Sequence, residues 1–444
     1  MSFYSRYPKV FLLFWTALVA SCAAPSSTTR TSSSPSPDYI GERVLRYDNK
    51  VYTKTIRTVT LNPVGNPLDL PILTLGVPQN LELRFDDLTG DLNNYSYHVI
   101  HCNADWTPSD LIEMQYIDGF FSDFITDYQV SFSTLIPFVH YRLEFPNSGM
   151  RLLLSGNYLL VVTENNDMSK PIISQRFMVV ESRVLIDPSV RQSSTIDDRS
   201  RAQAVDFIVQ HPSFDIGNPL RDLQAIVLQN GRWDNMVTGL QPTFIREKSL
   251  EYRYETGKDF KAGNEYRKFN ISSVRYNTED VTAIYRDSSR FVALLTPDLP
   301  RNKLGYRTWR DINGRFLVRS TDGFNDFSES DYIDVTFLLQ DRNGLLGKPV
   351  YVVGMFNRYE QTGSNKMLYN QEDKTYSLTL PFKQGYYEYL YTVKGRDGLP
   401  DVAPIEGSYF ETENDYTILI YYRDISNDYD QLIGAKTVST RDVF

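Results

Sequence analysis

The stretches Tyr95–Cys102 (YSYHVIHC) and Tyr141–Phe145 (YRLEF) both read as β-strands and decide the fold of this 444-residue chain. Between them lie Asn103–Asp110 and a run of aromatic residues, namely Tyr116, Phe120, Phe121, Phe124, Tyr128, Phe132 and Phe138. A connection of this length is far outside the usual few residues, and so aromatic a segment does not stay disordered. Two interpretations remain open. The segment covers its own β-sandwich, or it presents an apolar face to a partner.

Strand patterns recur along the rest of the chain at short intervals, with turn residues between them. Asn230-Gly231, directly after Leu228-Gln229, predicts a type I′ hairpin. Helical periodicity of three or more turns is nowhere evident, so the sequence predicts an all-β protein made of sandwiches. The expected strands are 81–85, 159–163, 177–180, 205–209, 223–228, 250–254, 291–295, 316–319, 332–339, 350–353, 376–380, 387–393 and 416–422.

Two polar, turn-rich seams suggest where domains end. Ser189–Arg201 is rich in Ser, Asp and Arg, and Asp341–Pro349 carries Gly344, Gly347 and Pro349. After the N-terminal leader about 420 residues remain, which at roughly 150 residues per domain suggests two or three domains. We therefore predict three tandem immunoglobulin-like β-sandwich domains, at residues 41–186, 203–340 and 348–438.

The N-terminus has the features of a bacterial lipoprotein signal. Arg6 and Lys9 precede an apolar run that is too short to span a bilayer, and Ala20-Ser21-Cys22 follows it. We predict a signal peptide at 1–21, lipidation of Cys22, and a Ser/Thr/Pro-rich tether at 22–40 that reaches about 20–25 Å. Ala23 after the anchor favours the periplasmic leaflet of the outer membrane. Cys102 would then be the single cysteine of the mature chain, without a disulfide.

We find no pattern that carries catalytic or metal chemistry. Along a strand His98 and Cys102 lie about 13 Å apart at about 3.3 Å per residue, while His101 points to the other face, so one ion cannot gather them. Asp311-Ile312-Asn313-Gly314 lacks the alternating ligands of a calcium loop and fits a turn. A net charge of −9 without a basic stripe argues against nucleic acid. We expect no enzyme activity, cofactor or metal.

The amino-acid sequence of the segment from Tyr95 to Phe145, together with several later segments, resembles that of the plug protein of the type IX secretion system. The likeness spans nearly the whole mature chain in order. It rests on His101–Trp106, Pro108–Leu111, Tyr116–Phe120, Asp127-Tyr128, Ser131-Phe132, His140–Leu143, Ser155–Tyr158, Asn218–Leu220, Gln229–Asn235, Gly263–Glu265, Asp311–Gly314, Tyr351–Asn357 and Gln384–Tyr387.

This resemblance implies a non-enzymatic component that closes the periplasmic mouth of the giant outer-membrane translocon barrel when no substrate passes. The chain would act as a monomer within a hetero-complex, held to the membrane by its N-terminal lipid. From the aromatic segment we choose Trp106, Phe120, Phe121 and Phe124 as the partner contacts.

The third predicted domain suggests an alternative function. Val352–Asn357, followed by Gly385–Tyr389, resembles the glycogen- and starch-binding branch of the immunoglobulin-like sandwiches. In that branch a Trp two residues after the Asn stacks on sugar, and Tyr359 occupies this position here. The alternative is therefore an outer-membrane-anchored carbohydrate-binding lipoprotein that uses Tyr359.

Overall fold

The computed structural model describes residues 44–253, 257–341, 345, 348–395, 398–423, 426 and 428–442. The predicted signal peptide, Cys22 and the tether lie outside this part. From Glu42 onward the chain forms one compact unit. In its described residues the protein is mostly β, built of antiparallel sheets, and no helix is longer than four residues.

The N-terminal sheet pair consists of two sheets that enclose one apolar core. The first sheet has the order β1 (Lys50–Val51), β12 (Pro171–Val180), β11 (Gly156–Glu164), β5 (Tyr95–Cys102) and β7 (Ser122–Phe124), with β3 (Ile72–Thr74) parallel to β12. The second has the order β2 (Ile56–Pro63), β4 (Leu81–Asp87), β9 (Val139–Phe145) and β8 (Asp127–Val130). The predicted strand at 95–102 is confirmed, and the one at 141–145 lies within β9.

The middle sheet pair encloses a second core. One sheet has the order β13 (Leu185–Gln192), β14 (Ala202–Gln210), β18 (Ser249–Tyr252) and β17 (Phe244–Arg246), with β19 (Phe260–Lys261) against β14. The other has the order β16 (Arg232–Leu240), β15 (Leu223–Gln229), β30 (Asp415–Tyr422) and β31 (Gln431–Ser439). Short helices α2 (Pro219–Asp222) and η3 (Thr440–Asp442) flank these strands.

The inserted sheet pair, built from the chain between β19 and β30, encloses a third core. One sheet has β20 (Arg267–Asn270), β28 (Gly385–Lys394) and β23 (Phe316–Val318), with β25 (Val350–Val353) and β29 (Pro400–Asp401) also paired to β28. The other has the order β21 (Val281–Asp287), β22 (Arg290–Leu295), β24 (Tyr332–Gln340), β27 (Thr375–Lys383) and β26 (Leu368–Asn370). Helical turns η1 (Met355–Asn357), η2 (Gly363–Asn365) and α3 (Ala403–Glu406) connect these strands.

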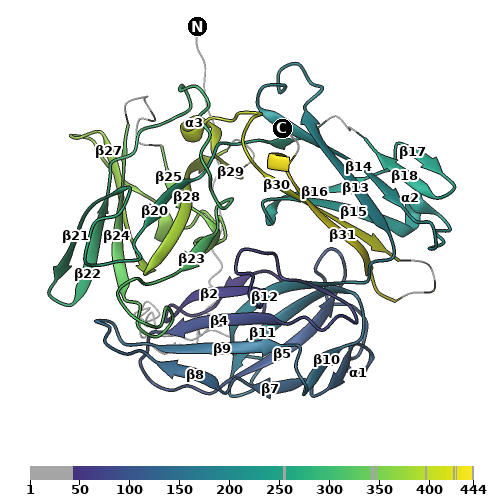
Figure 1. Ribbon diagram of the computed structural model, residues 1–444, viewed down its shortest axis with the longest axis horizontal. Helices are drawn as coiled ribbons and strands as arrows, with labels where there is room; N and C mark the ends of the chain where they lie inside the picture. Colours follow the sequence, from purple (N-terminus) through teal and green to yellow (C-terminus); the bar gives the residue numbers. More distant parts are fainter. Residues whose placement is uncertain are drawn as a thin grey trace, which may run out of the picture. The chain divides into compact units, whose positions relative to one another are not determined.

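Strand pairing does not follow the tandem boundaries that the sequence suggests. β13 and β14 form a hairpin, so the predicted seam Ser189–Arg201 consists of the end of β13 and the loop that joins the two strands. The seam at 341–349 connects β24 and β25, which both belong to the inserted pair. β15 pairs with β30, so the middle sheets take strands from both sides of the insertion, as the teal and yellow strands in Figure 1 show. Polar, turn-rich composition is typical of loops within a domain and of linkers between domains. No local pattern indicates that the chain returns to the middle sheet pair at β30.

The two-residue turn at Asn230-Gly231 confirms the predicted hairpin. Gln229 lies opposite Arg232, and Asn230 and Gly231 have φ of 54° and 70°. Positive φ at both central positions is what a type I′ turn requires, and Asn and Gly adopt it at the lowest steric cost. The turn sends β16 back beside β15 and places Trp233 next to the N-terminal sheet pair.

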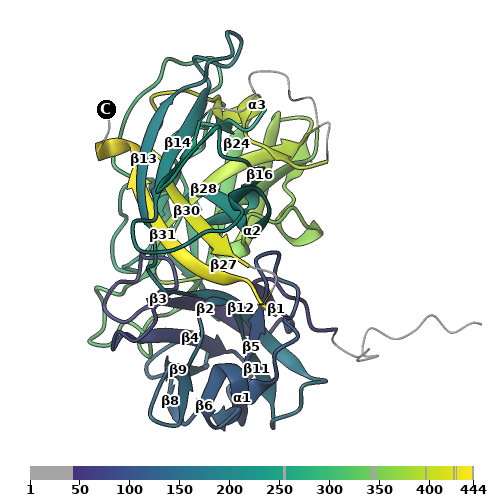
Figure 2. The ribbon, with the colours of Figure 1, turned by 90° about the vertical axis from the view of Figure 1, so that its right-hand side faces the viewer.

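The first sheet of the N-terminal pair is buried on both faces. Tyr158 and Leu160 of β11 point into the first core, whereas Leu159 and Val161 join Ile226, Leu228, Leu419 and Tyr421 in a separate cluster against the middle pair. Figure 2 shows β31 running down to β12, and the N–H of Glu181 donates to the carbonyl of Leu432 at 2.9 Å. Burial on both faces explains why β11 reads as a continuous apolar run.

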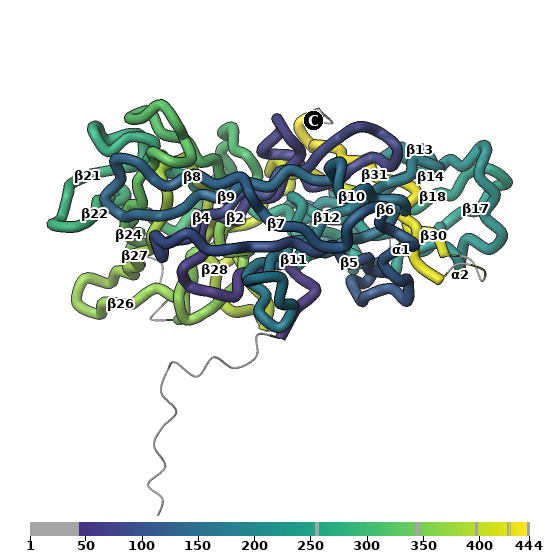
Figure 3. The backbone as a smooth tube through the Cα atoms, turned by 90° about the horizontal axis from the view of Figure 1, so that it is seen from below, coloured from purple at the N-terminus to yellow at the C-terminus, as the bar shows by residue number. Residues whose placement is uncertain are grey.

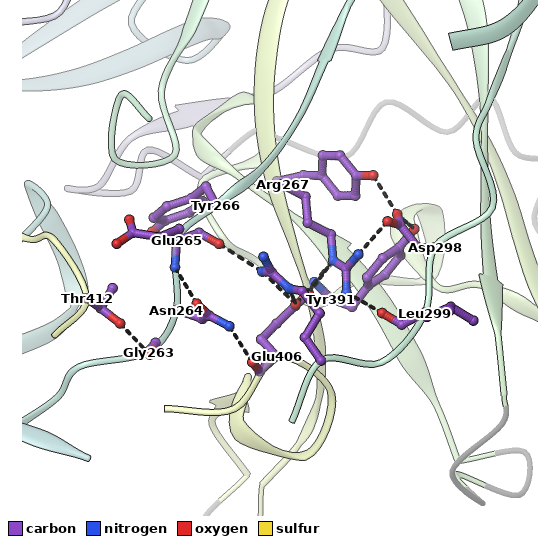
Figure 4. Close-up of polar contacts among 12 residues, drawn as sticks. Gly263, Asn264, Glu265, Tyr266, Arg267, Asp298, Leu299, Tyr391, Glu406 and Thr412 are labelled. Carbon is purple, nitrogen blue, oxygen red and sulfur yellow. Dashed lines mark hydrogen bonds and ion pairs between the residues drawn. The ribbon is translucent and has the colours of Figure 1, made fainter. Parts of the chain in front are cut away.

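The chain passes from the middle sheet pair to the inserted pair after β19 and returns before β30, and a buried ion cluster lies where these two connections meet (Figure 4). Arg267 donates to Glu406 at 3.0 and 3.1 Å and to the carbonyl of Leu299 at 2.7 Å, and Arg301 donates to Glu406 at 2.8 Å. Burial would raise the pKa of Glu406, but the two guanidinium groups hold it below its ordinary value. Thr412 donates to the carbonyl of Gly263 at 2.9 Å and so ties the outgoing strand to the returning one.

A second buried cluster joins the N-terminal and inserted pairs. Asp86 of β4 accepts hydrogen bonds from His140 at 2.6 Å, Lys383 at 2.6 Å and Tyr332 at 2.7 Å. Burial opposes ionisation of Asp86, yet the positive charge of Lys383 and the bond from His140 lower its pKa. Because both ends of this network are buried and paired, it fixes how these two sheet pairs meet.

Candidate partner-binding surface

The long aromatic segment between β5 and β9 folds as an ordered border of the N-terminal sheet pair. It contains α1 (Glu113–Tyr116), β6 (Ile117–Gly119), β7 and β8, and β6 pairs with β10 (Met150–Leu152). β7 is the last strand of one sheet and β8 is the last strand of the other. Figure 1 shows β7 and β8 along the lower border of the N-terminal pair, and Figure 3, seen from below, shows β6, β7 and β8 on the side that faces the viewer. One continuous piece of chain therefore borders this side of the sandwich.

Backbone geometry anchors this border. Gly119 has a φ of 112°, and a Cβ at this position would lie 2.2 Å from the carbonyl oxygen of Gly149, so only glycine fits. The N–H of Phe120 donates to that same carbonyl at 2.7 Å, and the N–H of Ile125 donates to Tyr95 at 2.8 Å. The side chain of Ile125 is buried in the first core. These contacts fix the backbone on both sides of the Phe120–Phe124 turn.

The side chains between these anchors project outward. Phe120 is 66% exposed, Phe121 42% and Phe124 53%. Three more exposed apolar residues continue the row along β8 and beyond it, so the apolar edge consists of Phe120, Phe121, Phe124, Tyr128, Val130 and Phe132. Single exposed apolar residues are ordinary, but six of them within thirteen residues, on and beside the edge strands of two sheets, are typical of a binding surface or an aggregation hazard.

Charged pairs border the apolar edge. Arg142 of β9 pairs with Asp127 of β8 at 3.1 Å, and Arg151 of β10 pairs with Asp118 of β6. Both pairs are solvent-exposed and contribute little to stability. Asp127 lies between Phe124 and Tyr128 in the chain, so this surface combines exposed apolar and charged side chains.

The structure does not place Trp106 on this surface, which corrects that prediction. Trp106 is 3% exposed, and its ring meets Trp233 of β16 edge to face, with centroids 4.9 Å apart. The guanidinium of Arg176 lies 4.4 Å from the centre of the Trp106 ring. Trp106 thus belongs to the contact between the N-terminal and middle pairs, because its complement is present in the same chain.

Tyr359 is likewise a packed residue. It is 6% exposed, lies in a cluster with Tyr266 and Leu390, and carries the guanidinium of Arg232 at 3.9 Å from its ring centre. Both sides of the ring are occupied by protein, which leaves no open face for a sugar. The predicted carbohydrate contact therefore has no structural support.

Sequence reasoning named three residues of the apolar edge and left out Tyr128, Val130 and Phe132 as contacts. These three alternate with polar residues, a pattern typical of one face of a strand. The period-two spacing of these residues, just after Phe124, could therefore have predicted that they extend the same surface. Cys22 lies outside the described residues.

No helix among the described residues is long and apolar enough to cross a membrane. The fold and this surface together define a mostly β protein of packed antiparallel sheets that presents an exposed apolar edge. Residues 56–181, which form the N-terminal sheet pair and its apolar edge, match the family model described as type 9 secretion system plug protein 1st domain. Residues 56–181 therefore belong to the family of first domains of type 9 secretion system plug proteins.

A solved structure shares this fold over most of the chain. A crystal structure of a hypothetical protein from Parabacteroides merdae ATCC 43184 is 35% identical, covers 89% of this chain and 100% of its own, and has a TM-score of 0.85. Native alpha-2-macroglobulin from Escherichia coli, spanning domains NIE-MG1, is 10% identical, covers 45% of this chain and 89% of its own, and has a TM-score of 0.17, too low to indicate a shared fold. The comparison with curated proteins gives no match.

Proposed function

We propose that this protein is a non-enzymatic component of the type IX secretion system that sterically closes the periplasmic opening of the outer-membrane translocon pore at rest. The observation that carries the proposal is the apolar edge, which lies within the residues that match the plug family. An exposed apolar surface of this kind can close a pore by shape and contact, without bond chemistry.

The apolar edge offers enough surface for a stable contact. Fully burying a Phe side chain contributes about 1.5–3 kcal/mol, and aromatic residues dominate the energetics of interfaces. A few buried residues usually supply most of the binding energy. We therefore assign the translocon barrel as partner and Phe120, Phe121 and Phe124 as the central contacts, with Tyr128, Val130 and Phe132 extending them.

Lipidation would hold the protein beside its partner. In this proposal Cys22 carries the lipid at the periplasmic face of the outer membrane, and residues 22–40 are a tether that spans about 20–25 Å. A tether raises the local concentration of the plug at the pore, so a reversible contact suffices for closure. We propose one copy of the chain per translocon, because the translocon barrel would cover the apolar edge and leave none of it for a second copy of the chain.

The first test is purification of the tagged, full-length chain from detergent-solubilised outer membranes of the producing bacterium, with mass spectrometry of the proteins that accompany it. We expect a very large barrel protein at near one-to-one ratio, and we expect it to persist in free glucan. A clean chain without that partner would contradict the proposal, and loss of the partner in glucan would favour a carbohydrate role.

Matched variants localise the contact. Phe120→Asp with Phe121→Asp should abolish recovery of the barrel protein while the isolated chain keeps its fold. The control is Phe244→Asp, which charges a 51% exposed aromatic on edge strand β17 of the middle pair and should leave recovery unchanged. Equal loss with both variants would contradict the assignment of the edge.

A further inference from the structure

A cavity of about 690 Å³ lies where the three sheet pairs meet. Strand β2 and the residues before it line one part, Leu228, Gly231 and Trp233 of the β15–β16 hairpin line a second, and residues 355–358 with Phe382 line a third. This volume lies within the range of small-molecule sites, which bury most of a ligand in a mainly apolar space with a few polar groups.

The wall of this cavity combines apolar surface with an excess of positive charge. The apolar part includes Val59, Leu61, Leu228, Trp233, Phe356 and Phe382. The basic lining residues are Lys50, Lys54, Arg57, Arg176, Arg358 and Lys383, against the two acidic ones Asp69 and Glu360. The whole chain has 55 acidic and 46 basic residues, so this local excess runs against its composition.

The basic residues of the wall differ in whether they already have partners. Lys383 is bonded to Asp86 at 2.6 Å, and Arg176 donates to the carbonyl of Tyr47 at 2.8 Å. The guanidinium of Arg358 makes no hydrogen bond or ion pair with any residue that the structure describes. Burial lowers the pKa of Arg358, and the nearby carboxylates of Glu360 and Asp48 oppose that shift without forming an ion pair with the guanidinium among the described residues.

Strained backbone presents this free guanidinium. Arg358 and Tyr359 follow η1 in the left-handed region, with φ of 57° and 59°. Each such non-glycine residue costs on the order of 1 kcal/mol, and strain of this kind tends to concentrate at functional sites. The side-chain amide of Asn357 donates to the carbonyl of Val352 at 2.8 Å and so fixes this turn, whose next residue, Arg358, lines the cavity.

We propose that this cavity is a binding site for an amphipathic organic anion, a small molecule that joins a carboxylate, sulfonate or phosphate group to an apolar body. Arg358 receives the anionic group, because an unpaired guanidinium gains a charge-assisted hydrogen bond there. The rings and aliphatic side chains of the wall receive the apolar body. This site is separate from the apolar edge and does not depend on the plug function.

A matched pair of fluorescent probes tests both halves of the proposal with the full chain. 8-Anilinonaphthalene-1-sulfonate carries an anionic group and N-phenyl-1-naphthylamine is the same molecule without it. We expect Arg358→Gln to raise the Kd of the sulfonate about 10-fold, which corresponds to about 1.4 kcal/mol, and to leave the Kd of the neutral probe within about twofold. An unchanged Kd of the sulfonate would overturn the proposal.

Two further variants keep the result interpretable. Thr60→Trp fills the cavity from β2 at a side chain that makes no hydrogen bond among the described residues, and it should weaken both probes. Arg275→Gln removes an exposed arginine outside the cavity and should change neither. If Arg358→Gln does not fold, Thr60→Trp decides, and unchanged binding of both probes would then overturn the proposal. Binding that is lost with Phe120→Ser and Phe121→Ser would also overturn it, because it would place the probes at the apolar edge.

Discussion

Two parts of the segment between β5 and β9 carry large aromatic side chains in opposite environments. Near its start Trp106 is buried against Trp233, whereas Phe120, Phe121 and Phe124 stand exposed on the border of the sandwich. The difference is that the middle sheet pair supplies a complementary ring for the first end, and the described part of the chain supplies none for the second. Composition therefore identifies a surface that needs burial, and only the fold shows whether the chain itself provides it.

The largest expected effect is at the buried end. Trp106→Ala should lower the free energy of unfolding by about 3–5 kcal/mol, because it empties a packed site and strips the partner ring and the Arg176 guanidinium of their contact. Urea unfolding followed by circular dichroism measures the loss. A change below about 1 kcal/mol would mean that the contact between the two sheet pairs does not stabilise the chain.

The next largest effect is expected from titration of Glu388, a buried residue of β28 that accepts hydrogen bonds from the backbone N–H groups of Ile312 and Gly314. Burial, reinforced by the neighbouring Asp311, raises the pKa of Glu388 to about 8, against 4.5 for a free side chain. The folded state then holds more protons than the unfolded state across this window. Stability is fully present below about pH 4.5 and is lost as pH rises through about 8. The urea midpoint should fall from pH 5 to pH 8, and Glu388→Gln should flatten that slope.

The apolar edge provides the control for this pH dependence. Its rings other than Tyr128 carry no titratable group, so Phe120→Ser with Phe121→Ser should keep the parent slope of urea midpoint against pH. A parent slope in Glu388→Gln would contradict the assignment of the slope to this carboxyl group.

A smaller effect is expected from a single buried hydrogen bond between the N-terminal and middle pairs. The hydroxyl of Tyr421 donates to Oδ1 of Asn157 at 2.7 Å, and both residues are buried. Tyr421→Phe leaves that oxygen without its donor and should cost about 1–2 kcal/mol. Tyr276→Phe, which alters an exposed hydroxyl, serves as the matched control and should leave the urea midpoint unchanged.

Sequence patterns predicted the strands well because strand formation is largely local. Tyr95–Cys102 and the Asn230-Gly231 turn were both found from period, composition and the positive φ that Asn and Gly tolerate. The domain boundaries could not be found the same way. β15 meets β30 almost two hundred positions later in the chain, and nothing within either strand records that pairing.

The candidate surface was predictable in its location and only partly in its members. A long aromatic connection had to pack against something, and that argument correctly singled out the segment. It could not separate Trp106 from Phe120, since the decisive fact for Trp106 is the position of Trp233 on a distant hairpin. The same holds for Tyr359, which packs against Arg232 of the middle sheet pair and against Tyr266, both far from it in the chain.

The smallest effect on stability is expected at the exposed end of the aromatic segment, where it sharpens the comparison most. Phe120→Ser with Phe121→Ser should change the free energy of unfolding by no more than about 0.5 kcal/mol, because neither ring is buried in the isolated chain. If the two rings await a partner, the same variant should nonetheless lose the outer-membrane protein in the pull-down. Urea unfolding and the pull-down on one preparation separate the two quantities. A decrease of several kcal/mol in the free energy of unfolding would show that these rings stabilise the sandwich. Phe120 and Phe121 would then have the same structural role as Trp106.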